Sequence, residues 1–237
     1  MTETVSYLLG KTGSLPLSAS VSASARVFKE LRARIVALRL PPGTVLNRAE
    51  LAEAFGVSQQ PIREAILRLE KIDLVITYRQ SRTEVTRINR ERLKQENFLR
   101  SGLECEVVDR LCRMGDGASL TKAKGYLKIQ EALVDDPNQV ELFRELDENF
   151  HNALFAAAGL EAVHELVTEQ SSQMARLRTL DLPRGRKLLS VFQGHQLVLD
   201  RIETGNRHGA ADAMREHLSG TIGRLPEIMS ANRSLFT

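Results

Sequence analysis

The apolar side chains between residues 24 and 40 recur every three or four positions, which is the spacing of one face of an α-helix. The residues that form this stripe are Val27, Leu31, Ile35 and Leu38. The segment Pro41-Pro42-Gly43 follows. We expect it to end the helix, because proline lacks the amide hydrogen that a continuing helix needs. The pattern therefore predicts an amphipathic helix at residues 24–40.

Two shorter helices are expected next, at residues 48–55 and 58–71. Asn47 precedes the first of them and can accept hydrogen bonds from its free amide groups. Gly56 follows that helix and suits the left-handed conformation of a C-cap. Ser58 is predicted to cap the second helix, whose first turn tolerates a proline.

Two short β-prone runs follow at residues 74–78 and 84–88, around a polar turn that predicts a hairpin. Three helices and then a hairpin is the element order of a winged helix-turn-helix domain. We predict this fold for residues 23–89. The Ser-rich residues 1–22 have few large apolar side chains and are expected to form a mobile arm.

The rest of the chain reads as helical, with breaks at glycine and proline positions. The six expected helices span residues 90–113, 119–134, 138–158, 160–180, 184–204 and 207–230. Aromatic residues make up 5% of the chain and tryptophan is absent, which suits a bundle rich in Ala and Leu. The predicted fold class is mainly α, with a six-helix antiparallel bundle at residues 90–237.

Composition supports two packed domains in a chain of 237 residues with 42% hydrophobic and 27% charged residues. No apolar run approaches the roughly 18 residues of a membrane helix, and we recognise no signal peptide. Cys105 and Cys112 fall on one expected helix about 10 Å apart, too far for a disulfide. We expect reduced thiols in a cytoplasmic protein that does not contact membranes.

The charge is unevenly distributed. Residues 1–90 contain 14 Lys and Arg against 8 Asp and Glu, whereas residues 91–237 contain 19 against 22. A basic N-terminal third on a mildly acidic body is typical of a separate nucleic-acid-binding module, although many other proteins show a similar split.

The helix at residues 58–71 has a buried and an exposed face. Its inward positions are Ile62, Ala65, Ile66 and Leu69. Gln59, Gln60 and Arg63 then lie on the exposed N-terminal part, which enters the major groove in helix-turn-helix proteins. Gln can pair with adenine and Arg with guanine. Such a face is also typical of an ordinary solvated helix, and the hairpin behind it favours DNA reading.

Four residues of the helical region form a candidate metal site. Asp147 and His151 are four positions apart on one expected helix, and His195 and His217 lie on two others. One carboxylate and three imidazoles suit zinc, nickel, manganese or iron. Spacing alone leaves open the alternative that each histidine is a polar residue at a helix surface.

The stretch from Pro41 to Val75 closely resembles the N-terminal domain of the GntR family of bacterial transcription factors. The shared residues include Pro42-Gly43, Leu51-Ala52, Gly56-Val57-Ser58, Pro61-Ile62-Arg63-Glu64-Ala65 and Arg68-Leu69. The resemblance covers about residues 24–88 and implies that the helix and the wing read double-stranded DNA. The expected DNA contacts are Arg48, Ser58, Gln59, Gln60, Arg63, Arg79, Ser81 and Arg82.

Two positions depart from that family. Gln59 stands where the family usually has Arg, and Arg82 stands where the wing usually has Gly. We therefore hypothesise an operator with adenine where relatives prefer guanine, read by Gln59 or Gln60. Arg79 and Arg82 are expected to reach phosphates or the minor groove.

The second region resembles the FCD ligand-binding domain of the FadR subfamily, and six helices suggest its VanR-type branch. The resemblance implies that Asp147, His151, His195 and His217 bind a divalent transition metal, with zinc preferred. Gly194 departs from the acidic residue that often precedes the third ligand. His164 and His208 have no place in the motif.

Two arginines are candidates for binding an effector. Arg100 occupies a position where the family typically has an arginine, followed four residues later by Glu104. A buried arginine beside a metal could hold a carboxylate through two hydrogen bonds, whereas an Arg100–Glu104 surface pair is the alternative. Arg176 is the second candidate.

These features predict a homodimeric transcriptional repressor that binds a near-palindromic operator and responds to a small organic acid at the metal. In one alternative the metal itself is the effector, and in another the metal is structural and the effector binds elsewhere. A metalloenzyme is a third alternative, but no base or nucleophile accompanies the metal motif.

Overall fold

The computed structural model describes residues 22–78, 82–183 and 186–237. The chain divides into two compact units, residues 1–89 with 234–237, and residues 90–233. The last four residues, which we had assigned to the second domain, thus belong to the first unit. The proposed arm at residues 1–22 lies outside the described residues, except for Ser22, and so do Arg79 and Ser81.

The first unit contains three helices, α2 (Ala23–Val36), α3 (Arg48–Phe55) and α4 (Gln59–Lys71). Asn47 caps α3 by accepting hydrogen bonds from the amides of Ala49 and Glu50. Gly56 ends that helix with a left-handed φ of 62°.

Two details of these helices differ from expectation. Ser58 occupies the N-cap position of α4, but its side chain makes no capping hydrogen bond. Helix α2 ends at Val36 rather than at residue 40, and Leu38 has a left-handed φ of 57°. Leu38 is therefore outside the helical stripe, and the fully buried Leu40 contributes to the core in its place.

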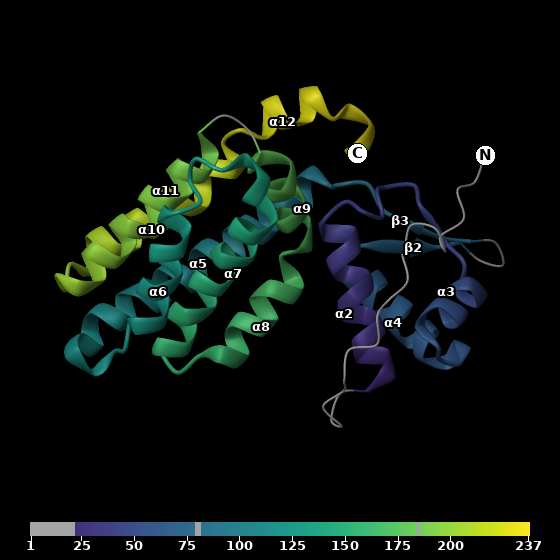
Figure 1. Cartoon of the computed structure of the whole chain (residues 1–237), viewed down its shortest axis with the longest axis horizontal. Coiled ribbons are helices and arrows are strands. Elements are labelled where there is room, and N and C mark those ends of the chain that lie inside the picture. Colours follow the sequence, from purple (N-terminus) through teal and green to yellow (C-terminus); the bar gives the residue numbers. More distant parts are fainter. Residues whose placement is uncertain (1–21, 79–81, 184–185) are drawn as a thin grey trace. The chain divides into compact units, whose positions relative to one another are not determined.

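The wing is a three-stranded antiparallel sheet in the order β1-β3-β2 (Figure 1). Strands β2 (Val75–Thr77) and β3 (Thr83–Val85) form the expected hairpin, with shorter strands than predicted. Strand β1 (Val45–Leu46) was not predicted, because two residues are too few to show an alternating pattern.

The C-terminus adds a further contact to this unit. Ile88 donates a backbone hydrogen bond of 2.8 Å to Leu235, and Thr237 donates one of 3.1 Å to Ile88. The side chain of Phe236 is buried. The last residues of the chain therefore pair with Ile88, which lies just before the end of the first segment of the winged unit.

The second unit is a helical bundle (Figure 1). Its helices are α5 (Arg90–Met114), α6 (Thr121–Glu131), α7 (Val140–Ala157), α8 (Glu161–Gln170), α9 (Ser172–Asp181), α10 (Lys187–Glu203), α11 (Arg207–Ile222) and α12 (Leu225–Ala231). Helix α5 packs along α11, α11 along α10, and α6 along α7. Among the described helices, none is both long and apolar enough to cross a membrane.

Two of the six expected helices are divided. The segment 160–180 breaks at Ser171, next to Ser172, whose hydroxyl donates to the Glu169 carbonyl at 3.2 Å and competes with the helix hydrogen bonds. The segment 207–230 breaks at Gly223 and Arg224, because Pro226 in the first turn of α12 has no amide hydrogen for a continuous helix.

Candidate functional site

The four predicted metal ligands meet inside the helical unit. Helix α7 carries Asp147 and His151, α10 carries His195 and α11 carries His217. One candidate ligand atom from each of the four lies within 4.8 Å of every other. Asp147, His151 and His195 are buried, and His217 is partly buried. Three helices remote in sequence thus direct these side chains at one point.

The distances between these atoms suit a shared cation. The Nε2 atoms of His217 and His151 are 3.3 Å apart, and Nε2 of His195 is 3.4 Å from Oδ1 of Asp147. Nε2 of His151 lies 4.0 Å from the same oxygen. Ligands bound tetrahedrally at 2.0–2.1 Å would be about 3.3 Å apart.

The donor set also fits a metal chemically. Nε2 of His195 is buried and makes no well-formed hydrogen bond among the described residues, with Oδ1 of Asp147 at 3.4 Å, a costly state unless another group binds it. Three imidazoles and one carboxylate are typical ligands of divalent transition metals. The residues present therefore fit such an ion.

The Nδ1 atoms of two ligands contact polar groups behind them. Nδ1 of His151 lies 2.6 Å from Oε2 of Glu104, whose other oxygen accepts a 2.7 Å hydrogen bond from Nε of Arg100. Nδ1 of His195 lies 2.8 Å from Oε1 of Gln130. Such contacts orient a ligating histidine and select the tautomer whose Nε2 is free for a metal.

Sequence reasoning missed the roles of these two supporting residues. Glu104 was noted only as the partner of Arg100, and the structure shows that this pair is buried. Gln130 gave no signal, because a single glutamine on an amphipathic helix is usually exposed and only the packing of α6 buries it.

Burial and neighbouring charges shift the pKa values of three of these residues, His195, His217 and Asp147. Burial lowers the pKa of His195 to about 4 and holds the pKa of His217 well below its usual range. Burial raises the pKa of Asp147, but His195, Arg178 and His151 outweigh this effect and hold it well below its usual range. At neutral pH these groups are therefore in the forms that bind a metal, neutral imidazole and ionised carboxylate.

Two neighbours fix the positions of the rings. Phe150 stacks on His195 with ring centroids 3.9 Å apart and an interplanar angle of 16°. A Cβ atom at Gly194 would lie 2.7 Å from Nδ1 of His217. Glycine at this position therefore leaves room for His217 beside α10, and a larger residue would require the His217 side chain to shift.

A small cavity adjoins the cluster, with a volume of about 20 Å³, or room for about one water. Its lining includes the ligands Asp147 and His217 and three cationic side chains, those of Arg100, Arg178 and Lys187. Burial and the nearby Arg100 charge lower the pKa of Arg178. Each of these cations has a carboxylate neighbour, since Arg100 pairs with Glu104 at 2.7 Å, Arg178 with Glu148 at 3.2 Å and Lys187 with Asp181 at 3.4 Å. An anion that enters the cavity must therefore exchange with these carboxylates.

The second effector candidate lies elsewhere. Arg176 is fully buried, donates a 2.5 Å hydrogen bond to Gln173 and does not line this cavity. Residues two positions apart on a helix point in different directions, so Arg178 faces the cavity instead. Sequence reasoning missed Arg178 and Lys187. His164 and His208, which it left outside the motif, are not part of the four-residue cluster.

In the winged unit, α4 has the expected two faces. Ile62, Ala65, Ile66 and Leu69 are buried. Ser58, Gln59, Gln60 and Arg63 are exposed, as is Arg48 on α3. Nε2 of Gln60 donates a 3.0 Å hydrogen bond to Glu64. The helix thus offers a polar N-terminal surface free of packing within this unit.

Arg82 borders the wing tip, where Arg79 and Ser81 lie outside the described residues. Its Nε lies 2.8 Å from Glu84, and its guanidinium is 5.0 Å from the centre of the Tyr78 ring. The side chain is 52% exposed, so the ion pair is weak enough for Arg82 to exchange Glu84 for a phosphate.

Sequence comparisons agree with this arrangement. Residues 23–85 match the bacterial regulatory proteins of the gntR family, and residues 98–220 match the FCD domain. An HTH-type transcriptional regulator from an unstable DNA locus of Streptomyces ambofaciens is 29% identical over 210 residues, 89% of this chain and 88% of that protein. The HTH-type transcriptional repressor RspR of Escherichia coli is 24% identical over 212 residues, 90% and 92% of the two chains.

Two solved structures share the fold. E. coli McbR/YncC superposes with a TM-score of 0.70 at 19% identity, covering 87% of this chain and 98% of that chain. A GntR transcriptional regulator from Rhodococcus sp. RHA1 has a TM-score of 0.65 at 20% identity, covering 89% and 99%. These likenesses concern the fold alone.

Proposed function

The chain belongs to the GntR family of bacterial regulatory proteins and carries an FCD domain, and from this premise we propose that it is a repressor controlled by a small organic acid. As its family and relatives indicate, it is a DNA-binding transcriptional regulator and not an enzyme. The proposal concerns the metal, the acid, the homodimer and the direction of the response.

The observation that carries the proposal is the cavity where two candidate ligands meet three cationic side chains. Asp147, His151, His195 and His217 would hold a divalent transition metal, with zinc preferred. The bound metal would supply a positive charge that attracts a carboxylate. Arg178 and Lys187, which line the same cavity, would bind this anion in exchange for their carboxylate partners Glu148 and Asp181.

The size of the cavity supports a conformational response. A volume of about 20 Å³ is too small for an organic acid, so side chains or helices must move before one binds. The lining also includes Leu182, which follows α9, Val191 on α10 and Leu218 on α11. An acid that favours the moved arrangement shifts the equilibrium toward it and can thereby change operator affinity.

A near-palindromic operator matches two winged units related by a twofold axis. We therefore propose a homodimer in which the acid alters the spacing of the two recognition helices. Loss of operator affinity on acid binding is the expected direction.

The test combines metal analysis with operator binding. Elemental analysis and native mass of the full-length protein would give the metal, its stoichiometry and any acid bound with it. Fluorescence anisotropy with an operator selected from random DNA would then follow affinity against mono- and dicarboxylates of two to six carbons. Arg178→Gln should raise the acid concentration needed for release about 10-fold, whereas Arg144→Gln, a partly exposed control on α7, should not.

The other outcomes are distinct. If metal alone switches operator affinity within its physiological range, the protein is a metal-responsive regulator. A metal that binds without switching, together with acids that bind without changing operator affinity, overturns the proposed mechanism.

The operator sequence tests the altered residue of α4. We propose that Gln59 or Gln60 selects adenine where relatives select guanine, because Gln pairs with adenine through two hydrogen bonds. Selection from random DNA should recover adenine, and Gln59→Ala or Gln60→Ala should relax that position. A guanine preference that Gln59→Ala removes contradicts the hypothesis.

A further inference from the structure

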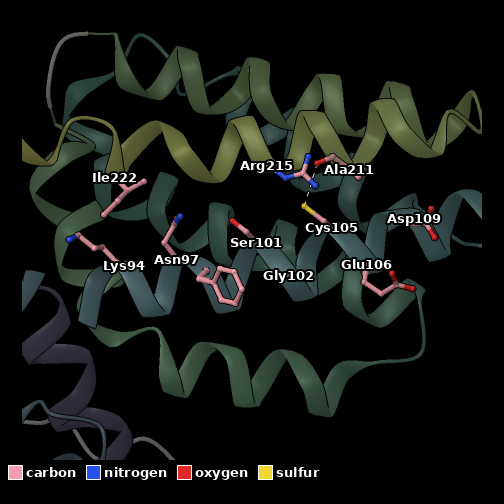
Figure 2. Close-up of a pocket in the computed structure, with 11 residues that line it drawn as sticks. Lys94, Asn97, Ser101, Gly102, Cys105, Glu106, Asp109, Ala211, Arg215 and Ile222 are labelled. Atoms are coloured by element: carbon pink, nitrogen blue, oxygen red, sulfur yellow. Dashed lines mark hydrogen bonds between the residues drawn. The ribbon is translucent and has the colours of Figure 1, made fainter. Parts of the chain in front are cut away.

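Helix α5 carries a row of charged side chains along its inner face. Arg92, Glu96, Arg100 and Glu104 are spaced four residues apart, so they lie one above another on the helix. The last three of them are buried. The other side of α5 lines a surface groove of about 710 Å³ together with α11 (Figure 2). The row of charges therefore faces the inside of the helical unit.

One member of this row takes no part in the site described above. Arg100 lines the metal cavity and Glu104 contacts His151, whereas Glu96 does neither. The side chain of Glu96 is only 2% exposed, and burial raises its pKa to about 7. A carboxyl group is costly to bury unless its hydrogen bonds are satisfied, so the contacts of Glu96 indicate its role.

These contacts are with the first turn of α9. Oε2 of Glu96 accepts a 2.8 Å hydrogen bond from the amide of Met174, and the amide of Gln173 also donates to this carboxyl group. Amides in the first turn of a helix have no helical carbonyl to bind. Ser171, the residue before α9, makes no side-chain capping hydrogen bond. A side chain of α5 therefore takes the place of the N-cap that α9 lacks.

Arg92 contacts the other side of the same break in the chain. It donates a 3.1 Å hydrogen bond to Oε1 of Gln170, the last residue of α8. Its Nε lies 3.4 Å from Oε1 of Glu96. The start of α5 is thus bonded to the end of α8 and to the start of α9, on both sides of Ser171.

Helix α9 links Glu96 to the cavity beside the metal cluster. The side chains of Met174 and Arg178 both line this cavity, and they are one helical turn apart. Glu96 binds the backbone of the first of them. Because one turn of a helix is rigid, the position of that backbone determines where the guanidinium of Arg178 lies.

We propose that Glu96 is a positioning residue, which caps α9 from α5 and thereby holds Arg178 in place at the metal cavity. The proposal rests on the proposed function, in which Arg178 binds the acid. Glu96 itself touches neither the candidate metal nor the acid and acts through α9.

Amide hydrogen exchange of the full-length protein tests the cap. Glu96→Leu inserts a side chain of similar size without oxygen acceptors. It should speed exchange at Gln173 and Met174 about 10-fold, the change expected when a helix loses its cap. Gln95→Leu makes the same replacement at an exposed neighbour and should leave this exchange unchanged.

Two conservative variants separate the contact from the charge. Glu96→Gln loses the charge but keeps an oxygen that can accept from the Met174 amide, so its exchange should stay within about threefold of wild type. Glu96→Asp keeps the charge on a side chain that is one methylene shorter and should behave like Glu96→Leu. The reverse order, with the Asp variant intact and the Gln variant impaired, overturns the capping role.

The operator assay tests the effect on the cavity, with the same mono- and dicarboxylates of two to six carbons. Glu96→Leu should raise the acid concentration needed for operator release about 5-fold, and Glu96→Gln should keep it within about twofold of wild type. The double variant Glu96→Leu/Arg178→Gln should need no more acid than Arg178→Gln alone, because Glu96 acts through Arg178. Metal affinity and operator affinity without acid should stay at the wild-type values, which shows that the variants fold.

The outcomes separate this proposal from the proposed function. Wild-type exchange in Glu96→Leu overturns the cap, and faster exchange with an unchanged acid requirement overturns the positioning role; in both cases the proposed function stands. If no acid of the series releases the wild type from its operator, the proposed function fails and the role of Glu96 in acid binding fails with it. If Glu96→Leu does not fold, the Asp and Gln variants decide the same points.

Discussion

The two units of this protein differ most in what they bury. Within the described residues, two buried polar side chains, Arg34 and Thr83, lie in the winged unit, and fifteen lie in the helical unit. An apolar cluster fills the interior of the described part of the winged unit, and the candidate DNA contacts described there lie on the outside. The helical unit surrounds its apolar clusters with buried polar residues that include three of the four candidate metal ligands, Asp147, His151 and His195.

This difference indicates how strongly the stability of each unit should depend on bound ligands. A unit with an apolar core holds its shape regardless of ligand, which suits the presentation of a recognition helix. A unit with many buried polar groups must compensate their desolvation by contacts, and bound ions or ligands can supply some of them. The helical unit is therefore the part whose stability should respond to small molecules.

The largest expected effect is a loss of metal affinity in a variant of the helical unit. His195→Ala should weaken metal affinity by about 100-fold or more, because one of the four proposed ligands is lost and such sites contribute roughly 10 kcal/mol. Competition with a chromophoric chelator measures it. His208→Ala, an exposed histidine of α11, is the control and should bind metal like wild type. Equal metal affinity in the His195 variant contradicts the assigned site.

The second prediction concerns a variant of the winged unit that should lose operator affinity and keep its metal affinity. Arg63→Ala should weaken binding to the selected operator by about 2 kcal/mol, because Arg63 is the arginine of α4 proposed to contact a base. Fluorescence anisotropy measures this loss, and binding to unrelated DNA should change much less. Metal affinity should stay the same. A parallel loss of metal binding would show that the two units are not independent.

The third prediction concerns a buried carboxyl group of the helical unit. Burial raises the pKa of Glu96 to about 7, although the Met174 amide and Arg92 favour its ionised form. The stability that Glu96 contributes is present below its unfolded pKa of 4.5 and is lost as the pH rises toward about 7.

Glu96→Gln should therefore stabilise the protein more at pH 8 than at pH 5, by about 2 kcal/mol. Urea unfolding at the two pH values gives this difference. Glu216→Gln, at an exposed carboxylate of α11, is the matched control and should show none. An equal effect at both pH values would mean that Glu96 is ionised in the folded protein throughout.

The smallest expected effect tests the contact between Gln130 and His195. Gln130→Ala should lower metal affinity by about 10-fold, because His195 loses the contact that orients its ring. Gln196→Ala changes an exposed glutamine next to His195 and should leave the affinity unchanged. The chelator competition used for His195 resolves this change, and an unaltered affinity would assign Gln130 to packing alone.

Much of the winged unit followed from the sequence, because its elements are local. The buried positions of α4 were predicted correctly, and so was the cap of α3 by Asn47. Strand β1 was missed because it exists only through pairing with β3. The end of α2 was misplaced because the left-handed turn at Leu38 has no clear residue signal.

The helical unit was predictable in a different way. Spacing left the metal site open, and the family motif selected its four residues, which the structure brings together. The cavity lining was predicted only in part, since Arg100 faces it and Arg176 does not. The breaks at Ser171 and before Pro226 were missed because the apolar pattern continues through both.

The residue pattern by itself determined the order of the main elements and the exposed face of α4, and the family resemblance added the identity of the candidate metal ligands. The tertiary structure decided that Glu104 and Gln130 contact the rings of two of these histidines. It also decided that Arg178 and Lys187 line the cavity. Finally, it placed His217 against Gly194. The physical reason is the range of the forces. Helical periodicity is a property of neighbouring residues, whereas the meeting of two faces depends on how helices far apart in the sequence pack.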